Sequence, residues 1–350
     1  MDSSYLFLPE LLLVASIMAI PALYIATENR KSYSICSNIT LSLSLLLLIL
    51  FWFYPDEVSF EKDATFYIFY DHFRIDAFSQ LFKVIFVLTA LTVSVISSAY
   101  FDEDEPHQPE YYTLLLASTF GMMIVASATD FLTLFLGIEI SAFSSYAMVA
   151  FRKQDDKSTE AGAKYLLIGA FSSALTLYGI SLLYALTGSI TFDGVQSMLS
   201  DTEVVSGEFN EVIFISSLFI LAGLGFKIAV VPFHAWAPDV YQGAPTPVTT
   251  LLAAGSKAMG FVALFRVFLF TMESVSEEWK LVLGIIALAS MTLGNIAAIS
   301  QNDIGRMLAY SSIAQAGYIL IAVPALTCLL YTSDAADEGL GVDLGGRRII

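Results

Sequence analysis

The fold is decided by a stretch that reads Gly225-Phe-Lys-Ile-Ala-Val-Val-Pro-Phe-His-Ala-Trp-Ala-Pro-Asp-Val-Tyr-Gln-Gly-Ala-Pro-Thr-Pro-Val248. It places Lys227 in an apolar run that Pro232 interrupts five residues later. A second lysine, Lys257, lies in the next apolar run. An ammonium at mid-membrane depth is costly, so an ionisable residue there is a functional hypothesis by default. The rest of the sequence must explain why these charges are tolerated.

The composition is that of a membrane protein. The chain has 350 residues, of which 57% are hydrophobic and 14% are charged. Soluble domains carry roughly 25% charged residues, and a membrane-spanning helix needs about 20 mostly apolar residues. Many segments here meet that length. A net charge of −17 without a basic patch excludes nucleic-acid binding.

Hydropathy predicts an all-α polytopic membrane protein with about ten transmembrane helices. The expected spans are residues 5–26, 34–54, 77–100, 111–128, 131–151, 161–187, 212–240, 246–270, 279–300 and 307–325. The seventh is too long for one straight crossing, and its proline predicts a broken helix. The first lacks a basic leader and is long enough to span, so we interpret it as a retained helix rather than a signal peptide.

Lysine and arginine in the loops predict the orientation. They concentrate in the odd-numbered loops, at Arg30, Lys31, Arg152, Lys153, Lys157 and Arg306. By the positive-inside rule these loops are cytoplasmic and the N-terminus lies outside. We expect a multi-pass protein of a bacterial inner membrane, surrounded by the lipid bilayer.

The chain divides into four expected parts: 1–110 with three N-terminal helices, 111–270 with five helices, 271–325 with two more, and an atypical tail at 326–350. The tail, from about Thr332 to Arg348, has neither helical periodicity nor the composition of a membrane loop. A soluble tail and a non-native end of a truncated gene are both open interpretations.

Lys227 beside Pro232 predicts a polar pocket inside the membrane. Pro232 cannot donate to the carbonyl of Ile228, and an unpaired carbonyl persists in hydrocarbon only where a cavity, water or a polar side chain meets it. Broken helices of transporters form sites in this way. The alternative is a simple kink with a lysine that extends to the membrane surface.

Two further ionisable residues are predicted to act with Lys227. Lys257 is flanked by small residues, which let helices or water approach closely. Glu139 lies midway along 131–151, and a glutamate whose distance to a lysine changes would load or release that lysine's proton. The residues do not tell which lysine Glu139 meets, although Lys227 is our guess. The alternative for Lys257 is a structural ion pair.

Lys164 and His234 are weaker candidates for proton transfer. Lys164 follows Ser158-Thr-Glu160, which resembles an N-cap, and reaches the cytoplasmic surface easily from there. His234 titrates near neutrality but could equally be a hydrogen-bonded structural histidine. Asp239 and the proline-rich turn after it are interpreted as structural.

The sequence contains no pattern for a redox centre or a metal site. Cys36 and Cys328 form no spaced pair, and His72, His107 and His234 are scattered. No Gly-rich dinucleotide motif follows a strand. Electrons, if this protein belongs to an oxidoreductase, travel through other subunits.

Three segments carry a resemblance to a known family. They are Val231-Pro-Phe-His-Ala-Trp-Ala-Pro-Asp-Val-Tyr-Gln-Gly-Ala-Pro-Thr-Pro-Val248 with Ser256-Lys257 after it, Gly137-Ile-Glu-Ile-Ser141, and Arg306-Met-Leu-Ala-Tyr-Ser-Ser-Ile-Ala-Gln-Ala-Gly-Tyr318. Together they resemble the antiporter-like subunits of respiratory complex I (NADH:quinone oxidoreductase), and among these the N subunits. The resemblance covers roughly residues 1–325.

The resemblance implies residue roles, partners and cofactors. The family's glutamate falls on Glu139 and its lysines on Lys227 and Lys257, while Lys164 matches a further lysine less securely. It also implies two inverted repeats, of which the second would be incomplete here. Partners would be the other membrane-arm subunits, with quinone only indirectly involved. This subunit would hold no cofactor, since FMN and iron–sulfur clusters belong to other subunits.

Three functions remain open from the sequence. The first is a proton-translocating, non-redox subunit of an NADH:quinone oxidoreductase. The second is a cation/proton antiporter subunit of the related Mrp class. The third is a scaffold of the membrane arm whose buried ion pairs are structural.

Overall fold

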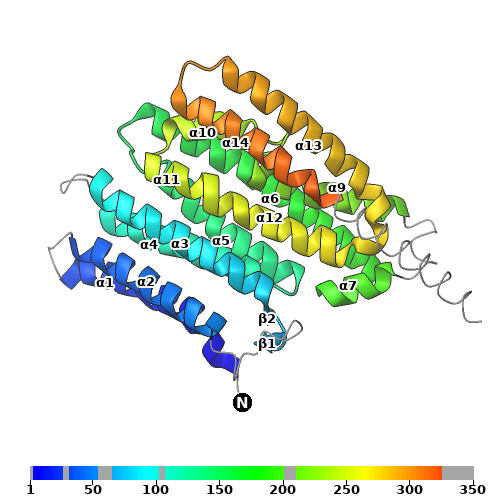
Figure 1. Ribbon diagram of the computed structural model, residues 1–350, viewed down its shortest axis with the longest axis horizontal. Coiled ribbons are helices and arrows are strands. Elements are labelled where there is room, and N and C mark those ends of the chain that lie inside the picture. The colour runs from blue at the N-terminus through cyan, green and yellow to red at the C-terminus, as the bar shows by residue number, and fades with distance from the viewer. Residues whose placement is uncertain (1–2, 27–30, 54–64, 102–106, 201–209, 325–350) are drawn as a thin grey trace, which may run out of the picture.

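The computed structural model describes residues 3–26, 31–53, 65–101, 107–200 and 210–324. Long helices lie side by side across the molecule, from α1 and α2 at one edge to α13 and α14 at the opposite edge (Figure 1). The predicted tail at 326–350 lies outside the described residues.

The first part of the chain forms a group of four helices. In order its elements are η1 (Ser3–Phe7), α1 (Leu8–Ala26), α2 (Lys31–Phe53), the hairpin strands β1 (Phe66–Ile68) and β2 (Phe73–Ile75), α3 (Ala77–Tyr100) and α4 (Gln108–Ser127). Both α1 and α3 pack along α2 and α4. Consequently α1 and α3 occupy opposite corners of the group.

The remaining helices surround the interrupted segment. They are α5 (Phe131–Val149), α6 (Asp156–Thr187), α7 (Phe192–Leu199), α9 (Asn210–Ile228), α10 (Trp236–Gly243), α11 (Thr246–Leu251), η2 (Leu252–Ser256), α12 (Lys257–Leu264), η3 (Phe265–Thr271), η4 (Glu273–Val275), α13 (Ser276–Ile299) and α14 (Ile304–Leu320). The closest pairings are α4 with α5, α6 with α9, and α13 with α14. Helix α10 packs against both α6 and α14.

Nine helices among the described residues are long and apolar enough to cross a membrane. They correspond to nine of the ten expected spans. The tenth, expected at 111–128, is helix α4, which has 20 residues but a less apolar composition. Most of α4 is buried among its neighbours, so its surface does not have to match lipid.

Successive helices run in opposite directions, which the loop contacts confirm at both ends. At one end Gly243 lies against the backbone of Lys157, and Gly305 against the backbone of Tyr241. At the other end Phe73 pairs with Ala128, and Asp130 pairs with Thr191. The loops therefore alternate between two ends, as in a chain that crosses a membrane repeatedly.

Aspartates fix where several helices begin. Asp76 accepts a hydrogen bond from the Ser79 backbone N–H at 2.7 Å, while the Ser79 hydroxyl receives one from the Asp76 N–H. Such a capping box pairs donors that a helix start leaves free. Asp155 similarly caps α6. This helix begins five residues before the expected 161–187, so the N-cap predicted from Ser158-Thr-Glu160 is wrong.

The interruption lies between α9 and α10. Helix α9 ends at Ile228, Ala229 adopts a left-handed backbone (φ 56°), and α10 begins at Trp236. Two side chains satisfy backbone groups here, because the Val231 N–H donates to the Ser290 hydroxyl at 2.9 Å and the Trp236 indole donates to the Phe226 carbonyl at 3.0 Å. Irregular backbone at this depth requires such partners.

Candidate functional site

Glu139 of α5 and Lys227 of α9 line the same small cavity. Side chains of α6, including Ser173 and Thr176, complete its wall. Its volume of about 10 Å³ is close to the space that one water needs. The carboxylate of Glu139 is near enough to act electrostatically on the Lys227 ammonium. The structure thus brings together the two residues whose pairing was guessed from the sequence.

Lys227 is deeply buried and unpaired. The residue is 4% exposed, and its Nζ has no hydrogen-bond partner among the described residues. Besides the Glu139 carboxylate, the ring of Tyr146 acts favourably on the ammonium, with its centroid 5.7 Å from Nζ. A cation–π contact of this kind supplies at most about 2 kcal/mol. An ionisable side chain buried at this depth is a candidate functional residue.

Ser173 holds the carboxylate of Glu139. Its hydroxyl donates to Glu139 Oε1 at 2.5 Å. Thr176 lies one turn further along α6, against Gly223 of α9. Any side chain at Gly223 would collide with the Thr176 hydroxyl, so the two helices pack closely here. Ser173 was not predicted from the sequence, because a serine next to Ser172 in an apolar helix gives no signal of its partner.

Lys257 lies at the start of α12, directly after the π-helical turn η2. Its Nζ donates to the Ser312 carbonyl at 2.9 Å and to the Ser312 hydroxyl at 2.8 Å. The described residues place no carboxylate in an ion pair with Lys257, so the alternative of a structural ion pair lacks a partner in this part of the chain. π-Helical turns often occur at functional sites.

A glycine sets the approach of α12 to α9. A Cβ at Gly260 would lie 3.2 Å from Lys227 Cβ and 2.6 Å from Ile228 Cγ2. Only a residue without a side chain fits there. Gly260 thus contacts Lys227, and Lys257 lies three residues before Gly260 on α12. The two lysines are therefore on adjacent helices, separated by about one helical turn along α12.

Lys164 takes part in a different cluster. Its ammonium pairs with Asp239 of α10 at 2.7 Å and with Glu160 at 2.7 Å, and its side chain is 43% exposed. Asp239 also binds Arg306 of α14 at 2.5 Å. Burial disfavours the charged form of Asp239, but the hydrogen bonds and charges of Lys164 and Arg306 outweigh it and hold its pKa below the usual value. Lys164 is therefore placed with surface ion pairs rather than with the Glu139–Lys227 cavity.

His234 lies in the interruption between α9 and α10. Its Nδ1 is buried and has no partner among the described residues. A neutral imidazole can accept and pass on a proton.

A second pair of buried charges joins the start of α3 to η3. Arg266 donates to both carboxylate oxygens of Asp76, at 3.2 Å and 3.1 Å, and to the Ala126 carbonyl at 2.9 Å. Burial opposes ionisation of Asp76, but Arg266, the Ser79 N–H and Arg74 prevail and lower its pKa. Sequence analysis missed this pair, although Arg266 is another lone charge in an apolar segment.

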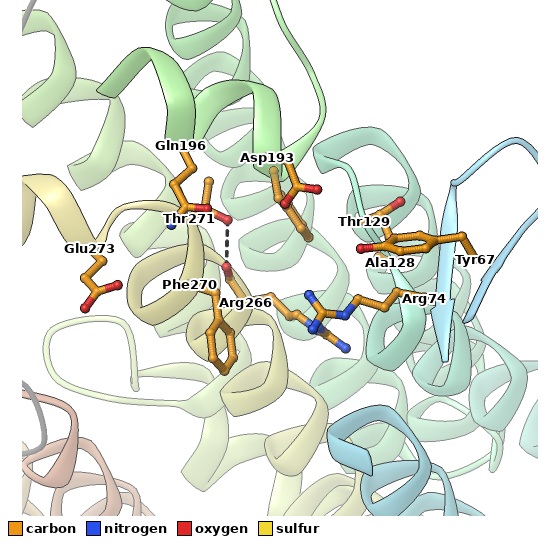
Figure 2. A pocket seen from close by; sticks show the side chains of 11 residues that line it. Tyr67, Arg74, Ala128, Thr129, Asp193, Gln196, Arg266, Phe270, Thr271 and Glu273 are labelled. Carbon is orange, nitrogen blue, oxygen red and sulfur yellow. Dashed lines mark hydrogen bonds between the residues drawn. The ribbon is translucent and has the colours of Figure 1, made fainter. Parts of the chain in front are cut away.

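Arg266 and Arg74 also border a pocket of about 190 Å³ beside the β1–β2 hairpin. Figure 2 shows the two guanidinium groups next to each other, with Asp193 and Glu273 at other sides of the pocket. The pocket contains none of the residues predicted to carry protons. In the part of the chain that the structure describes, no three His, Cys, Asp or Glu side chains gather to hold a metal ion.

Comparison with known proteins identifies the family. Residues 128–333 match the family described as "NADH:quinone oxidoreductase/Mrp antiporter, TM". The chain belongs to this family. With its membrane-spanning helices, it is a multi-pass membrane protein. The resemblance seen in the sequence is thus confirmed.

Relatives of the chain are named as subunits of oxidoreductases. It is 39% identical over 321 residues to "F(420)H(2) dehydrogenase subunit N" of Methanosarcina mazei, covering 91% of this chain and 64% of that protein. It is 44% identical over 255 residues to "NADH-quinone oxidoreductase subunit N" of Desulforamulus reducens, covering 73% of this chain and 52% of that protein. The chain therefore spans between about half and two thirds of the length of these relatives.

Solved structures of this family share the fold. A chain of respiratory complex I from Thermus thermophilus superposes with a TM-score of 0.73 at 31% identity, over 90% of this chain and 64% of that one. A chain of the Mrp complex from Dietzia sp. gives 0.77 at 19% identity, over 90% of this chain and 58% of that one. The predicted all-α antiporter-like fold is confirmed.

Proposed function

We propose that the chain is part of a proton-translocating membrane-arm subunit of an NADH:quinone oxidoreductase. The observation that carries this proposal is the cavity shared by Glu139 and Lys227 beside an interrupted helix. The names of the relatives at 36–44% identity support the oxidoreductase context. The subunit itself holds no redox group, and FMN and iron–sulfur clusters belong to its partners.

Proton movement in this proposal depends on the charge balance around Lys227. When the Glu139 carboxylate is close, it stabilises the ammonium, and Lys227 takes up a proton. When the carboxylate is drawn away, the buried ammonium loses its main compensation and releases that proton. Lys257, one turn away on α12, accepts it, and the Ser312 oxygens stabilise the resulting ammonium. Lys164 and His234 are the less certain members of the path, and Lys164 would act at the ion-pair cluster of Asp239 rather than in the cavity.

Partners and location follow from the same proposal. The other membrane-arm subunits of the complex supply the electron-transfer steps, and quinone reduction there shifts charge along the buried residues. The membrane is a bacterial inner membrane, with the loops rich in Lys and Arg in the cytoplasm. The N-terminus lies on the outer side.

The test replaces Lys227 or Glu139 with alanine in the full-length subunit within its complex. We expect NADH-driven acidification of inverted vesicles to be abolished in both variants. Lys153→Ala, at an exposed lysine, is the matched control and should pump normally. Undiminished pumping in both variants would contradict the proposal.

The second candidate function is an Mrp-type cation/proton antiporter subunit, which the shared fold supports. It differs in needing no NADH. Sodium-dependent proton exchange by vesicles without NADH, lost in Lys227→Ala, would favour this candidate. NADH-dependent proton movement that ignores sodium would favour the first.

A further inference from the structure

The four N-terminal helices enclose an ion pair that lies outside the Glu139–Lys227 cavity. Glu10 is the only charged residue of α1, and Lys83 is the only one of α3. The fold brings these two charges together, with Lys83 Nζ 2.6 Å from Glu10 Oε1. Both side chains are 1% exposed. Since α1 and α3 occupy opposite corners of the group, the pair crosses its centre.

Several buried polar atoms of Glu10 and Gln80 have no hydrogen-bond partner among the described residues. Glu10 Oε2 has no hydrogen-bond partner, and neither the oxygen nor the nitrogen of the Gln80 amide has one among the described residues. Gln80 is also 1% exposed. It stands three residues before Lys83 and so shares its face of α3. Buried polar groups are nearly always hydrogen-bonded, and water is the usual partner when protein supplies none.

Stability alone does not account for the pair. Replacing a buried ion pair by apolar residues is often neutral or stabilising, because desolvation of the two ions offsets their attraction. Ionisable residues inside membrane helices typically mark the paths of ions and protons. Among the described side chains, the nearby helices add Glu110, at the start of α4, and Lys257 of α12, which packs against α3 and α4. The start of α4 lies at the end of the group opposite to Glu10, and the Lys257 ammonium is bound to Ser312, so neither residue pairs with Glu10 or Lys83.

A column of buried hydroxyls leads away from the pair. On α2, Ser44, Thr40 and Ser37 share one face, at steps of about 6 Å and 4.5 Å along the helix. Their contacts continue across the group as Ser44 to the Pro9 carbonyl, Thr40 to Ser16, Ser37 to Ser94, and Ser97 to Tyr111. Single waters bridge steps of this size. The column ends at Tyr111, near the start of α4.

We propose that Glu10, Gln80 and Lys83 form a hydrated proton-binding site, separate from the Glu139–Lys227 cavity. At rest the site holds a carboxylate and an ammonium. On uptake, hydronium breaks one O–H bond, water leaves, and the proton forms an O–H bond on Glu10. The site then carries one positive charge, and release reverses the step. The Gln80 amide holds the water that delivers the proton.

The test measures protonation directly, so it does not depend on pumping. The full chain in lipid vesicles is titrated with acid, and infrared difference spectra record the C=O band of protonated carboxylic acids in H₂O and D₂O. We expect a D₂O-sensitive band that Glu10→Gln removes. The matched control Glu211→Gln, at an exposed glutamate near the start of α9, should retain it. In Lys83→Met the band should appear at higher pH, because no ammonium then favours the carboxylate.

Two further variants keep the proposal falsifiable if Glu10→Gln does not fold. Gln80→Leu leaves the ion pair in place and should slow the appearance of the band after a rapid drop in pH, recorded by time-resolved infrared spectra. The double variant Glu10→Gln with Lys83→Met leaves no unpaired charge and should fold without the band. A band that is the same in the double variant as in the original chain overturns the proposal, as does a band in Gln80→Leu with unchanged rate.

Discussion

Lys257 and Ser312 join α12 to α14 through two hydrogen bonds, to the carbonyl at 2.9 Å and to the hydroxyl at 2.8 Å. The ammonium is thus held by neutral oxygens rather than by a carboxylate. Neutral acceptors stabilise a buried ammonium less than an opposite charge does. In the function proposed above, Lys257 accepts a proton and gives it up again, and this set of partners supports that role.

The first prediction concerns the Ser312 hydroxyl. Ser312→Ala removes one of the two bonds to the Lys257 ammonium, each worth about 1.5–3 kcal/mol to a charged group. We expect proton translocation to fall roughly tenfold or more while electron transfer persists. Ser311→Ala, at the exposed neighbouring residue, is the control. An equal loss in both variants would point to damage of α14 instead.

The second prediction concerns the hydroxyl that holds Glu139. Ser173→Ala leaves the Glu139 carboxylate without its donor, so we expect slower proton translocation at unchanged assembly. Ser173→Thr keeps the hydroxyl and should restore most of the rate. Ser181→Ala, at an exposed serine of the same helix, should have no effect. Vesicle acidification with parallel quinone-reduction assays measures both quantities.

The third prediction tests the buried pair of Asp76 and Arg266. Arg266→Leu removes the bidentate partner of Asp76 and leaves only Arg74, whose Nε lies 3.0 Å from the same carboxylate. Breaking a buried pair typically costs about 3–5 kcal/mol. We expect a lower unfolding temperature in detergent. The double variant Asp76→Asn with Arg266→Leu removes both charges and should lose less stability than the single variant. Greater loss in the double variant would mean that the charges are not coupled.

The fourth prediction is a pH dependence at the ion-pair cluster of Asp239, Lys164 and Arg306. The pKa of Asp239 in the folded chain lies below the ordinary value of 3.8, so its stabilising effect is complete above that value. The effect is lost as the pH falls through the folded-state pKa. Asp239→Asn should therefore lower the melting temperature at neutral pH and converge with the original chain in strong acid. Asp193→Asn, at an exposed residue, should follow the original chain throughout.

Much of the architecture could be predicted from the sequence because hydrocarbon permits few solutions. Long apolar runs must be helices, and a proline in a run too long for one crossing favours an interruption. The proline alone does not decide this, since Pro21 lies inside α1 without ending it. The helix α4 was found by its length and position, although its composition is less apolar than that of the others. The N-cap of α6 was misplaced because Asp155 competes with Ser158 for the same role.

The candidate site was only partly predictable. Glu139 and Lys227 could be selected as lone charges, but their common cavity depends on how α5, α6 and α9 pack. Selecting every lone charge in an apolar segment would also have selected Glu10, Lys83 and Arg266. It could not have found their partners, since those lie far away in the sequence and only the packed helices bring them together.

The ion pairs of Asp239 limit how the interrupted helix can move. An irregular linker connects α10 to α9. Asp239, the one carboxylate of α10, is bound to Lys164 of α6 and to Arg306 of α14. The linker can therefore bend only in two ways. Either α10 carries α6 and α14 along as one unit, or it exchanges these ion pairs for water. Labels on α10 and α14 would consequently keep a constant separation during turnover in the first case and a variable one in the second.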